Sequence, residues 1–251
     1  MRHTLLTLYG PFAIHGYGLM IFIGLLIFMI LIKKNKKFAE LKLESHLNGI
    51  LLLATCVGLL GGRLLFLFSN PTFYTSFFDI FTFYTGGFSI LGCILAILLV
   101  IPFYLSYLHI PIIPFFDLIA LYTPLLQSIS RIGCFLAGCC YGLPTNLPWG
   151  IIYTDQESIA PLYVCLHPTQ LYSAISLLVI FTFLYFIVQK YYTKPGQLLA
   201  CYLLSIGVER FFIEYWRGDA QFQSNLTINQ FIALLMITGS IIGLIITQLK
   251  K

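Results

Sequence analysis

Two arginines and a glutamate recur at helical spacing near position 210. Residues 209–219 read ERFFIEYWRGD, so a continuous helix would place Arg210, Glu214 and Arg217 on one face at i, i+4 and i+7. Two guanidinium groups with a carboxylate between them suit a phosphate clamp, because Arg binds phosphate bidentately and the Glu would hold that geometry. The alternative is a helix end that carries ion pairs and aromatic anchors.

A glycine-rich segment follows another arginine. Residues 130–142 read SRIGCFLAGCCYG. We expect a helix to end near Arg131, and the three glycines that follow, with Gly142 the last, predict a tight loop in which backbone approaches a ligand.

A third polar segment, residues 166–172, reads LHPTQLY. Pro168 suits the first turn of a helix, which would place His167 and Gln170 at the rim of that helix. A single histidine at such a boundary is more often structural than catalytic, so both interpretations of His167 stay open.

The composition indicates the environment that these segments occupy. The chain has 251 residues, of which 59% are hydrophobic and 9% charged, whereas a soluble domain carries roughly 25% charged residues. This excludes a soluble domain, a disordered chain and a nucleic-acid binder, so no nucleic-acid partner is expected despite the net charge of +5. The sequence predicts an all-α polytopic membrane protein.

Seven segments are long and apolar enough to cross a membrane as helices, which takes about 20 residues each. They are 13–32, 48–68, 88–108, 113–129, 168–189, 197–216 and 228–248. The fourth is short and interrupted by Pro124, and the first is too long for a signal peptide. The runs lack the alternation of a barrel, and no internal repeat divides 1–251, so we expect a single integral membrane domain.

The lysines predict the orientation of these helices. All nine follow the first, fifth and seventh segments, whereas the opposite side carries only arginine. The positive-inside rule then places the amino terminus outside, in the periplasm, and the carboxyl terminus in the cytoplasm. Arg210 and Arg217 fall at the outer lipid boundary, and this location favours the phosphate clamp.

Two further ionisable residues fall inside predicted helices, where they are costly. Arg63 lies near the outer end of the second segment, where it either serves the site or extends outward to the headgroups. Asp117 lies near the start of the fourth segment, and there a helix N-terminus accounts for a carboxylate without any chemistry.

The seven cysteines fall into two groups. Cys56, Cys93 and Cys201 lie in apolar segments and read as small hydrophobes. The others lie on the predicted outer, oxidising side, where Cys165 is a candidate for a disulfide with Cys139 or Cys140; they are Cys134, Cys139, Cys140 and Cys165. The C-x4-C-C spacing lacks the C-x2-C pattern of common zinc sites, so we expect no metal and no cofactor.

Taken together, these segments resemble the phosphatidylglycerol:prolipoprotein diacylglyceryl transferase family of bacterial inner-membrane enzymes. Residues 10–20, GPFAIHGYGLM, are similar to its G-P-x-x-(I/L)-x-x-Y-G-(L/I)-M motif, and Gly62-Arg63-Leu64 to its G-x-R-L step. Residues 131–142 share the frame of its R-x-G-N-F-x-N-G-E-x-x-G loop. Residues 167–172 resemble H-P-(S/T)-Q-L-Y, and 210–217 resemble R-x-x-x-E-x-x-R.

The resemblance implies a seven-helix fold whose site opens to the outer leaflet. The family moves the diacylglyceryl group of phosphatidylglycerol to the lipobox cysteine of a prolipoprotein signal peptide and releases glycerol phosphate. The expected partners are therefore phosphatidylglycerol, that signal peptide and membrane lipids. Lipid binding carries over to Arg131, and an essential role near the leaving phosphate carries over to Arg210. The supporting and lining residues would be Tyr17, Arg63, Gly142, His167, Gln170, Glu214 and Arg217.

Several positions depart from the family pattern. Leu91 occupies the histidine position of its G-G-x-S-F-H-G-G segment, Cys134 and Ala137 replace two asparagines, and Cys139 replaces a glutamate. The proton of the acceptor thiol would then pass to His167 or Tyr17, or nearby arginines would lower the thiol pKa without a dedicated base. Two alternatives stay open: a lipid-binding paralogue without this chemistry, and a thiol-redox or metal protein built on the outer cysteines.

Overall fold

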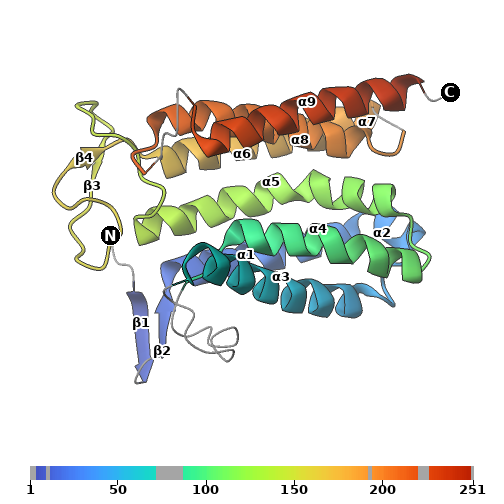
Figure 1. Ribbon diagram of the computed structural model, residues 1–251, viewed down its shortest axis with the longest axis horizontal. Helices are drawn as coiled ribbons and strands as arrows, with labels where there is room; N and C mark the ends of the chain where they lie inside the picture. The colour runs from blue at the N-terminus through green and yellow to red at the C-terminus, as the bar shows by residue number, and fades with distance from the viewer. Residues whose placement is uncertain (1–3, 10–11, 72–86, 192–193, 220–225, 250–251) are drawn as a thin grey trace. The chain divides into compact units, whose positions relative to one another are not determined.

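The computed structural model describes residues 4–9, 12–71, 87–191, 194–219 and 226–249 (Figure 1). The described chain is mostly helical and divides into two compact units. One unit comprises Met1–Lys34 with Phe116–Lys251, and the other comprises Asn35–Phe115. The single domain over 1–251 stays a prediction.

The larger unit holds most of the helices. They are α1 (Gly16–Lys34), most of α5 (Ile112–Ala137), α6 (Thr169–Phe183), α7 (Gln189–Tyr191), α8 (Gln197–Ile213) and α9 (Ile228–Leu249). A π-helical turn, Leu184–Val188, joins α6 to α7, and a 3-10 turn, Glu214–Trp216, follows α8. Two short antiparallel sheets complete the unit: β1 (Thr4–Tyr9) with β2 (Phe12–His15), and β3 (Ile151–Ile152) with β4 (Cys165–Leu166).

Six described helices are long and apolar enough to cross a membrane. They are Gly16–Lys34, Leu47–Ser69, Ile90–Tyr107, Ile112–Ala137, Thr169–Tyr191 and Ile228–Leu249. The remaining predicted segment, 197–216, coincides with α8, whose 17 residues include Glu209 and Arg210. Each predicted segment therefore lies on a helix, while a seventh membrane span stays a prediction.

The first predicted helix begins too early. Residues 12–15 form strand β2 rather than helix, and α1 begins at Gly16. The pairing of Thr4 with His15 and of Tyr9 with Phe12 takes the backbone into a hairpin. An apolar sequence cannot distinguish this strand from a first helical turn.

Helix α5 corrects two predictions. Pro124 does not interrupt it, and it continues six residues beyond Arg131 to Ala137. Pro124 removes one backbone amide donor from the helix, a loss that transmembrane helices tolerate. Gly133 therefore lies within the helix, where a Cβ would be 3.2 Å from the Tyr17 Cα. This close approach packs α1 against α5.

Asp117 caps a helix other than its own. Its side chain is only 2% exposed, and its two oxygens accept from the backbone amides of Gly196 (2.7 Å) and Leu199 (2.8 Å). These amides begin α8, whose N-terminus would otherwise leave them unpaired. The prediction that a helix N-terminus accounts for this carboxylate is confirmed, but the helix that Asp117 caps is α8 and not its own helix, α5.

Polar side chains and a small residue join α5, α6, α8 and α9. The Ser128 hydroxyl donates to the Ala174 carbonyl at 2.7 Å, and the Ser173 hydroxyl donates to Glu209 Oε1 at 2.5 Å. At Gly207 a Cβ would lie 3.1 Å from the Ala233 carbonyl oxygen, so α8 and α9 approach closely. Figure 1 shows α6, α8 and α9 side by side.

The smaller unit contains α2 (Lys36–Glu40), α3 (Leu47–Ser69) and α4 (Ile90–Tyr107). Arg63 on α3 is 3% exposed, its Nη1 donates to the Gly87 carbonyl at 2.9 Å, and its guanidinium lies over the Phe66 ring. The interpretation in which the Arg63 side chain extends outward to the lipid headgroups is therefore wrong. Leu91 lies half-exposed on α4, and Gly86 of the same motif lies outside the described residues.

Candidate functional site

Three segments that are distant in sequence meet at Gly142. Its amide donates to the His167 carbonyl at 3.1 Å, and the Gly218 amide donates to the Tyr141 carbonyl at 2.9 Å. The next residue, Leu143, donates to the Trp216 carbonyl at 2.8 Å. A Cβ at Gly142 would collide with the His167 carbonyl oxygen, so only glycine allows this crossing. The junction brings together the three polar segments that the sequence singled out.

The same junction ends the helix that carries Arg210. The sequence predicted a continuous helix through Arg217, but α8 ends at Ile213 and Arg217 is extended, with φ −77° and ψ 129°. The backbone of Trp216 and Gly218 pairs with residues 141–143 instead of continuing the helix. The prediction that Arg210, Glu214 and Arg217 share one face of a continuous helix is therefore wrong. The junction around Gly142 positions Arg217 instead.

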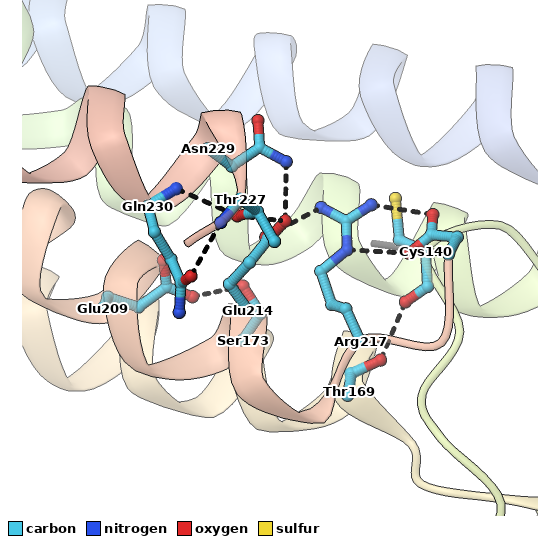
Figure 2. Close-up of polar contacts among 10 residues, drawn as sticks. Cys140, Thr169, Ser173, Glu209, Glu214, Arg217, Thr227, Asn229 and Gln230 are labelled. Carbon is cyan, nitrogen blue, oxygen red and sulfur yellow. Dashed lines mark hydrogen bonds and ion pairs between the residues drawn. The ribbon is translucent and has the colours of Figure 1, made fainter. Parts of the chain in front are cut away.

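Glu214 is fully buried and held by the start of α9 (Figure 2). Its Oε1 accepts from Asn229 Nδ2 at 2.8 Å and from the Thr227 hydroxyl at 3.2 Å. Its Oε2 lies 3.6 Å from Arg217 Nη1. Glu214 therefore links α9 to Arg217.

Thr227 and Gln230 form a capping box that was not among the predictions from the sequence. The Thr227 amide donates to Gln230 Oε1 at 3.0 Å, and the Gln230 amide donates to the Thr227 hydroxyl at 3.1 Å. The signal is present in the sequence as T-x-x-Q directly before an apolar run. This box fixes the turn from which Thr227 and Asn229 contact Glu214.

Arg217 is neutralised by the protein itself. Its Nε and Nη2 donate to the two carboxylate oxygens of Asp219 at 2.9 and 2.7 Å. Burial alone would lower the pKa of Arg217, but the hydrogen bonds to Asp219 and the charges nearby raise it well above its ordinary value. Arg217 is thus a fixed cation between Asp219 and Glu214.

Arg131 and Arg210 have different surroundings. Arg131, Arg210 and Arg217 lie close enough to interact electrostatically, with Glu209 and Glu214 also in range. Over the ranges of the chain that the structure describes, no side chain forms a hydrogen bond or ion pair with Arg131 or Arg210. Glu209 instead accepts the hydroxyl of Ser173. The cationic charge available for an external anion therefore resides on Arg131 and Arg210.

The segment from His167 to Tyr172 supports the glycine-rich loop. Gln170 is 1% exposed, and its Nε2 donates to the Cys139 carbonyl at 2.8 Å and to the Tyr153 hydroxyl at 3.2 Å. His167 Nδ1 lies 3.2 Å from the Tyr172 hydroxyl. Burial raises the pKa of Tyr153 to about 12, so this phenol stays protonated at neutral pH.

Three cysteines gather beside these residues. The sulfur atoms of Cys134, Cys139 and Cys140 all lie within 4.8 Å of one another. Tyr17 on α1 is in electrostatic range of these thiols and of Arg131. All seven cysteines are free, so the disulfide suggested between Cys165 and Cys139 or Cys140 is not present in the structure.

The thiols of the cluster differ in acidity. Hydrogen bonds from the Cys134 and Cys139 thiols, with Arg131 and Arg217 nearby, lower the pKa of Cys140. Hydrogen bonding and burial raise the pKa of Cys139. One thiolate is therefore favoured at Cys140, stabilised by its two thiol neighbours.

Comparisons with known proteins agree over nearly the whole chain. The model of the family described as prolipoprotein diacylglyceryl transferase matches residues 3–246. The chain is similar to the phosphatidylglycerol–prolipoprotein diacylglyceryl transferase of Clostridium tetani, with 34% identity over 100% of this chain and 98% of the relative. The chain is also 32% identical to phosphatidylglycerol–prolipoprotein diacylglyceryl transferase 2 of Clostridium perfringens, over 100% of this chain and 97% of the relative. The transferase of Clostridioides difficile is 31% identical, over 97% and 94%.

Proposed function

The chain belongs to the prolipoprotein diacylglyceryl transferase family, and on that premise we propose that it transfers the diacylglyceryl group of phosphatidylglycerol to a prolipoprotein cysteine. The thiol sulfur forms a thioether with the glyceryl carbon, and glycerol phosphate leaves. The acceptor cysteine lies in the lipobox of a signal peptide. The chain uses no nucleic acid.

The observation that carries this proposal is the contrast among the three arginines. Arg217 is bound by Asp219, whereas Arg131 and Arg210 have no side-chain partner in the described part of the chain. Negative charge grows on the leaving phosphate as the carbon–oxygen bond breaks, and fixed cations stabilise such charge best in a water-poor site. Arg131 binds the lipid phosphate, and Arg210 stabilises it as it leaves.

The other residues position these groups. Glu214 and Arg217 hold the turn after α8 against α9, and Gly142 and Gln170 hold the glycine-rich loop. For Arg63, on α3 of the smaller unit, lipid binding rests on the resemblance of Gly62-Arg63-Leu64 to the family motif. These roles make the junction around Gly142 the frame of the phosphate site.

The acceptor thiol must lose its proton before it attacks, because the thiolate is the nucleophile. Tyr17 and His167 are the proposed proton acceptors. Tyr17 lies in electrostatic range of Arg131, and His167 contacts Tyr172 through Nδ1. Leu91 cannot serve, because its side chain has no titratable group.

A second candidate is a paralogue that binds phospholipid without this chemistry or uses another acceptor. Leu91, Cys134 and Cys139 favour it, because they replace polar family residues. Such a protein would keep the arginine site but would not support growth in place of the authentic enzyme.

We further propose seven spans in the bacterial inner membrane, with the site facing the periplasm. The lysines after α1, near α7 and at the end of the chain support this orientation. An epitope inserted after Glu157 should then bind antibody on intact spheroplasts, and one inserted after Leu41 only after permeabilisation. Labelling of the Leu41 epitope on intact spheroplasts would contradict the orientation.

Growth rescue tests the proposed function. Cells depleted of their own transferase should grow when they express this chain, and the Arg131→Ala and Arg210→Ala variants should fail. Lys34→Ala, an exposed cation at the end of α1, is the matched control and should rescue. Failure of the well-expressed wild-type chain, alongside rescue by an established family member, would support the second candidate.

A further inference from the structure

The thiol cluster has the dimensions of a metal-binding site. Cys134 lies in the last turn of α5, and Cys139 and Cys140 follow in the loop. Their sulfur atoms lie within 4.8 Å of one another. Zinc–thiolate bonds of about 2.3 Å in tetrahedral geometry separate two sulfurs by about 3.8 Å, so a small contraction closes the cluster around an ion.

The loop backbone brings two adjacent thiols to one side. Neighbouring side chains on an extended chain point in opposite directions. Here Gly138 has φ +73° and Cys140 has φ +57°, a left-handed conformation that is uncommon for a residue with a side chain. This turn lets Cys139 and Cys140 both lie close to Cys134.

Buried hydrogen bonds hold that loop. The Cys139 carbonyl accepts from Gln170 Nε2 and the Cys140 carbonyl accepts from the Thr169 hydroxyl, both at 2.8 Å. Thr169 and Gln170 are each 1% exposed. The thiols therefore stand on a fixed backbone, which lowers the conformational cost of binding a ligand.

The charges around the cluster favour thiolates. Arg131 and Arg217 lie in electrostatic range of Cys140. A thiolate rather than a thiol is the metal ligand. Three thiolates around a divalent ion leave a net negative complex, which nearby arginines stabilise.

We propose that Cys134, Cys139 and Cys140 form a three-thiolate site for a thiophilic metal ion of the Zn²⁺ or Cu⁺ class. Soft sulfur ligands select such ions. No fourth ligand joins the cluster among the described residues, so a bound Zn²⁺ would keep one position for water or an external ligand. The C-x4-C-C spacing did not predict this site, because the left-handed turn rather than the sequence spacing brings the sulfurs together. The site does not depend on the proposed transfer reaction.

Metal binding by the full chain tests the proposal. Protein purified in detergent with a reductant and then stripped of metal should bind about one Zn²⁺ per chain, measured by elemental analysis after desalting. Co²⁺ should give a thiolate charge-transfer band that Zn²⁺ displaces. Cys134→Ser, Cys139→Ser and Cys140→Ser should each lose the band.

The chain offers matched controls. Cys165→Ser and Cys201→Ser remove half-buried and buried thiols outside the cluster and should keep the band. Alkylation of the folded wild-type protein needs no variant to fold. It should abolish the Co²⁺ band, whereas protein alkylated with Zn²⁺ bound and then stripped of Zn²⁺ should still give the band. A wild-type chain that binds neither ion, a band that survives Cys140→Ser, or a disulfide between two cluster cysteines that persists after reduction would overturn the proposal.

Discussion

At the scale of single residues, three arginines of one site differ in what surrounds them. Asp219 and Glu214 neutralise Arg217, while Arg131 and Arg210 have the charge to receive an anion. Like charges this close are stable only when carboxylates or a bound anion offset them. In the proposed reaction, the phosphate of the lipid would supply such an anion.

Glu214→Gln tests how Arg217 is held. Gln keeps an oxygen for Asn229 and Thr227 but removes the charge beside Arg217. We expect a loss of about 1–3 kcal/mol in the free energy of unfolding and about a tenfold lower transfer rate. Thermal unfolding in detergent and initial rates measure both.

Glu40→Gln is the matched control for this substitution, because Glu40 is exposed on α2. It should leave both quantities unchanged. A Glu214→Gln variant with wild-type stability and rate would show that the carboxylate does not position Arg217.

The thiols predict an unusual pH dependence of alkylation in the metal-free protein. The pKa of Cys140 is lowered, so its thiolate should persist as the pH falls below about 8.5, the ordinary pKa of a thiol. The stabilisation from this thiolate is present above the unfolded pKa and is lost as pH falls through the folded pKa. Cys139, whose pKa is raised, should react only at higher pH.

Peptide mapping after brief iodoacetamide treatment at about pH 6 and about pH 8 separates the two thiols. Cys140 should be modified at nearly the same rate at both values. Equal pH dependence at Cys139 and Cys140 would mean that the cluster does not favour one thiolate.

The residue types pointed to several of the side chains that the structure brings together, but not to the contacts between them. Arginine, glutamate and glutamine in an apolar chain indicated Arg131, Arg210, Glu214 and Gln170, because a membrane protein has few reasons to carry them. Sequence spacing could not predict the pairing of Arg217 with Asp219 or the meeting of three thiols. Those contacts depend on turns at Trp216 and Cys140 that leave regular secondary structure.

At the scale of elements, Asp117 connects the start of α5 to the start of α8. Its carboxylate accepts two backbone amides while almost fully buried. Asp117→Ala should lower the free energy of unfolding by about 1–3 kcal/mol, because it leaves these amides unpaired. Thermal unfolding of purified protein measures the loss.

Asp117→Asn provides the comparison for this effect. Asn keeps the volume of the side chain and one acceptor oxygen. The free energy of unfolding should therefore fall less in Asp117→Asn than in Asp117→Ala. Activity per folded molecule should be unchanged in both, since Asp117 caps α8 at the end opposite to Arg210. Equal stability of Ala and wild type would contradict the capping role.

The length of the apolar segments was enough to predict that helices form there, but it did not predict where those helices begin and end. The predicted segments lie on helices because about 20 apolar residues form few other structures in a membrane. The ends at Gly16, Ala137 and Ile213 depend on tertiary pairing: a hairpin before α1, the thiol loop after α5 and the Gly142 junction after α8.

At the scale of the whole molecule, the scarcity of charge is the strongest constraint. The 9% of charged residues predicted a membrane protein, and six apolar helices of spanning length agree with it. Nine of the fourteen cations are lysines outside the arginine site. Among the described residues, four charged side chains are buried: Arg63, Asp117, Glu209 and Glu214.

Transfer by the purified chain tests the central claim most directly. Labelled phosphatidylglycerol and a lipobox peptide, mixed with the protein in detergent, should yield a thioether-linked diacylglyceryl peptide and glycerol phosphate. Arg131→Ala and Arg210→Ala should each reduce the rate at least about 100-fold, as removal of a group that stabilises developing charge does. Absence of transfer by the wild-type chain, while an established family member modifies the same peptide, or full activity in both arginine variants, would contradict the account.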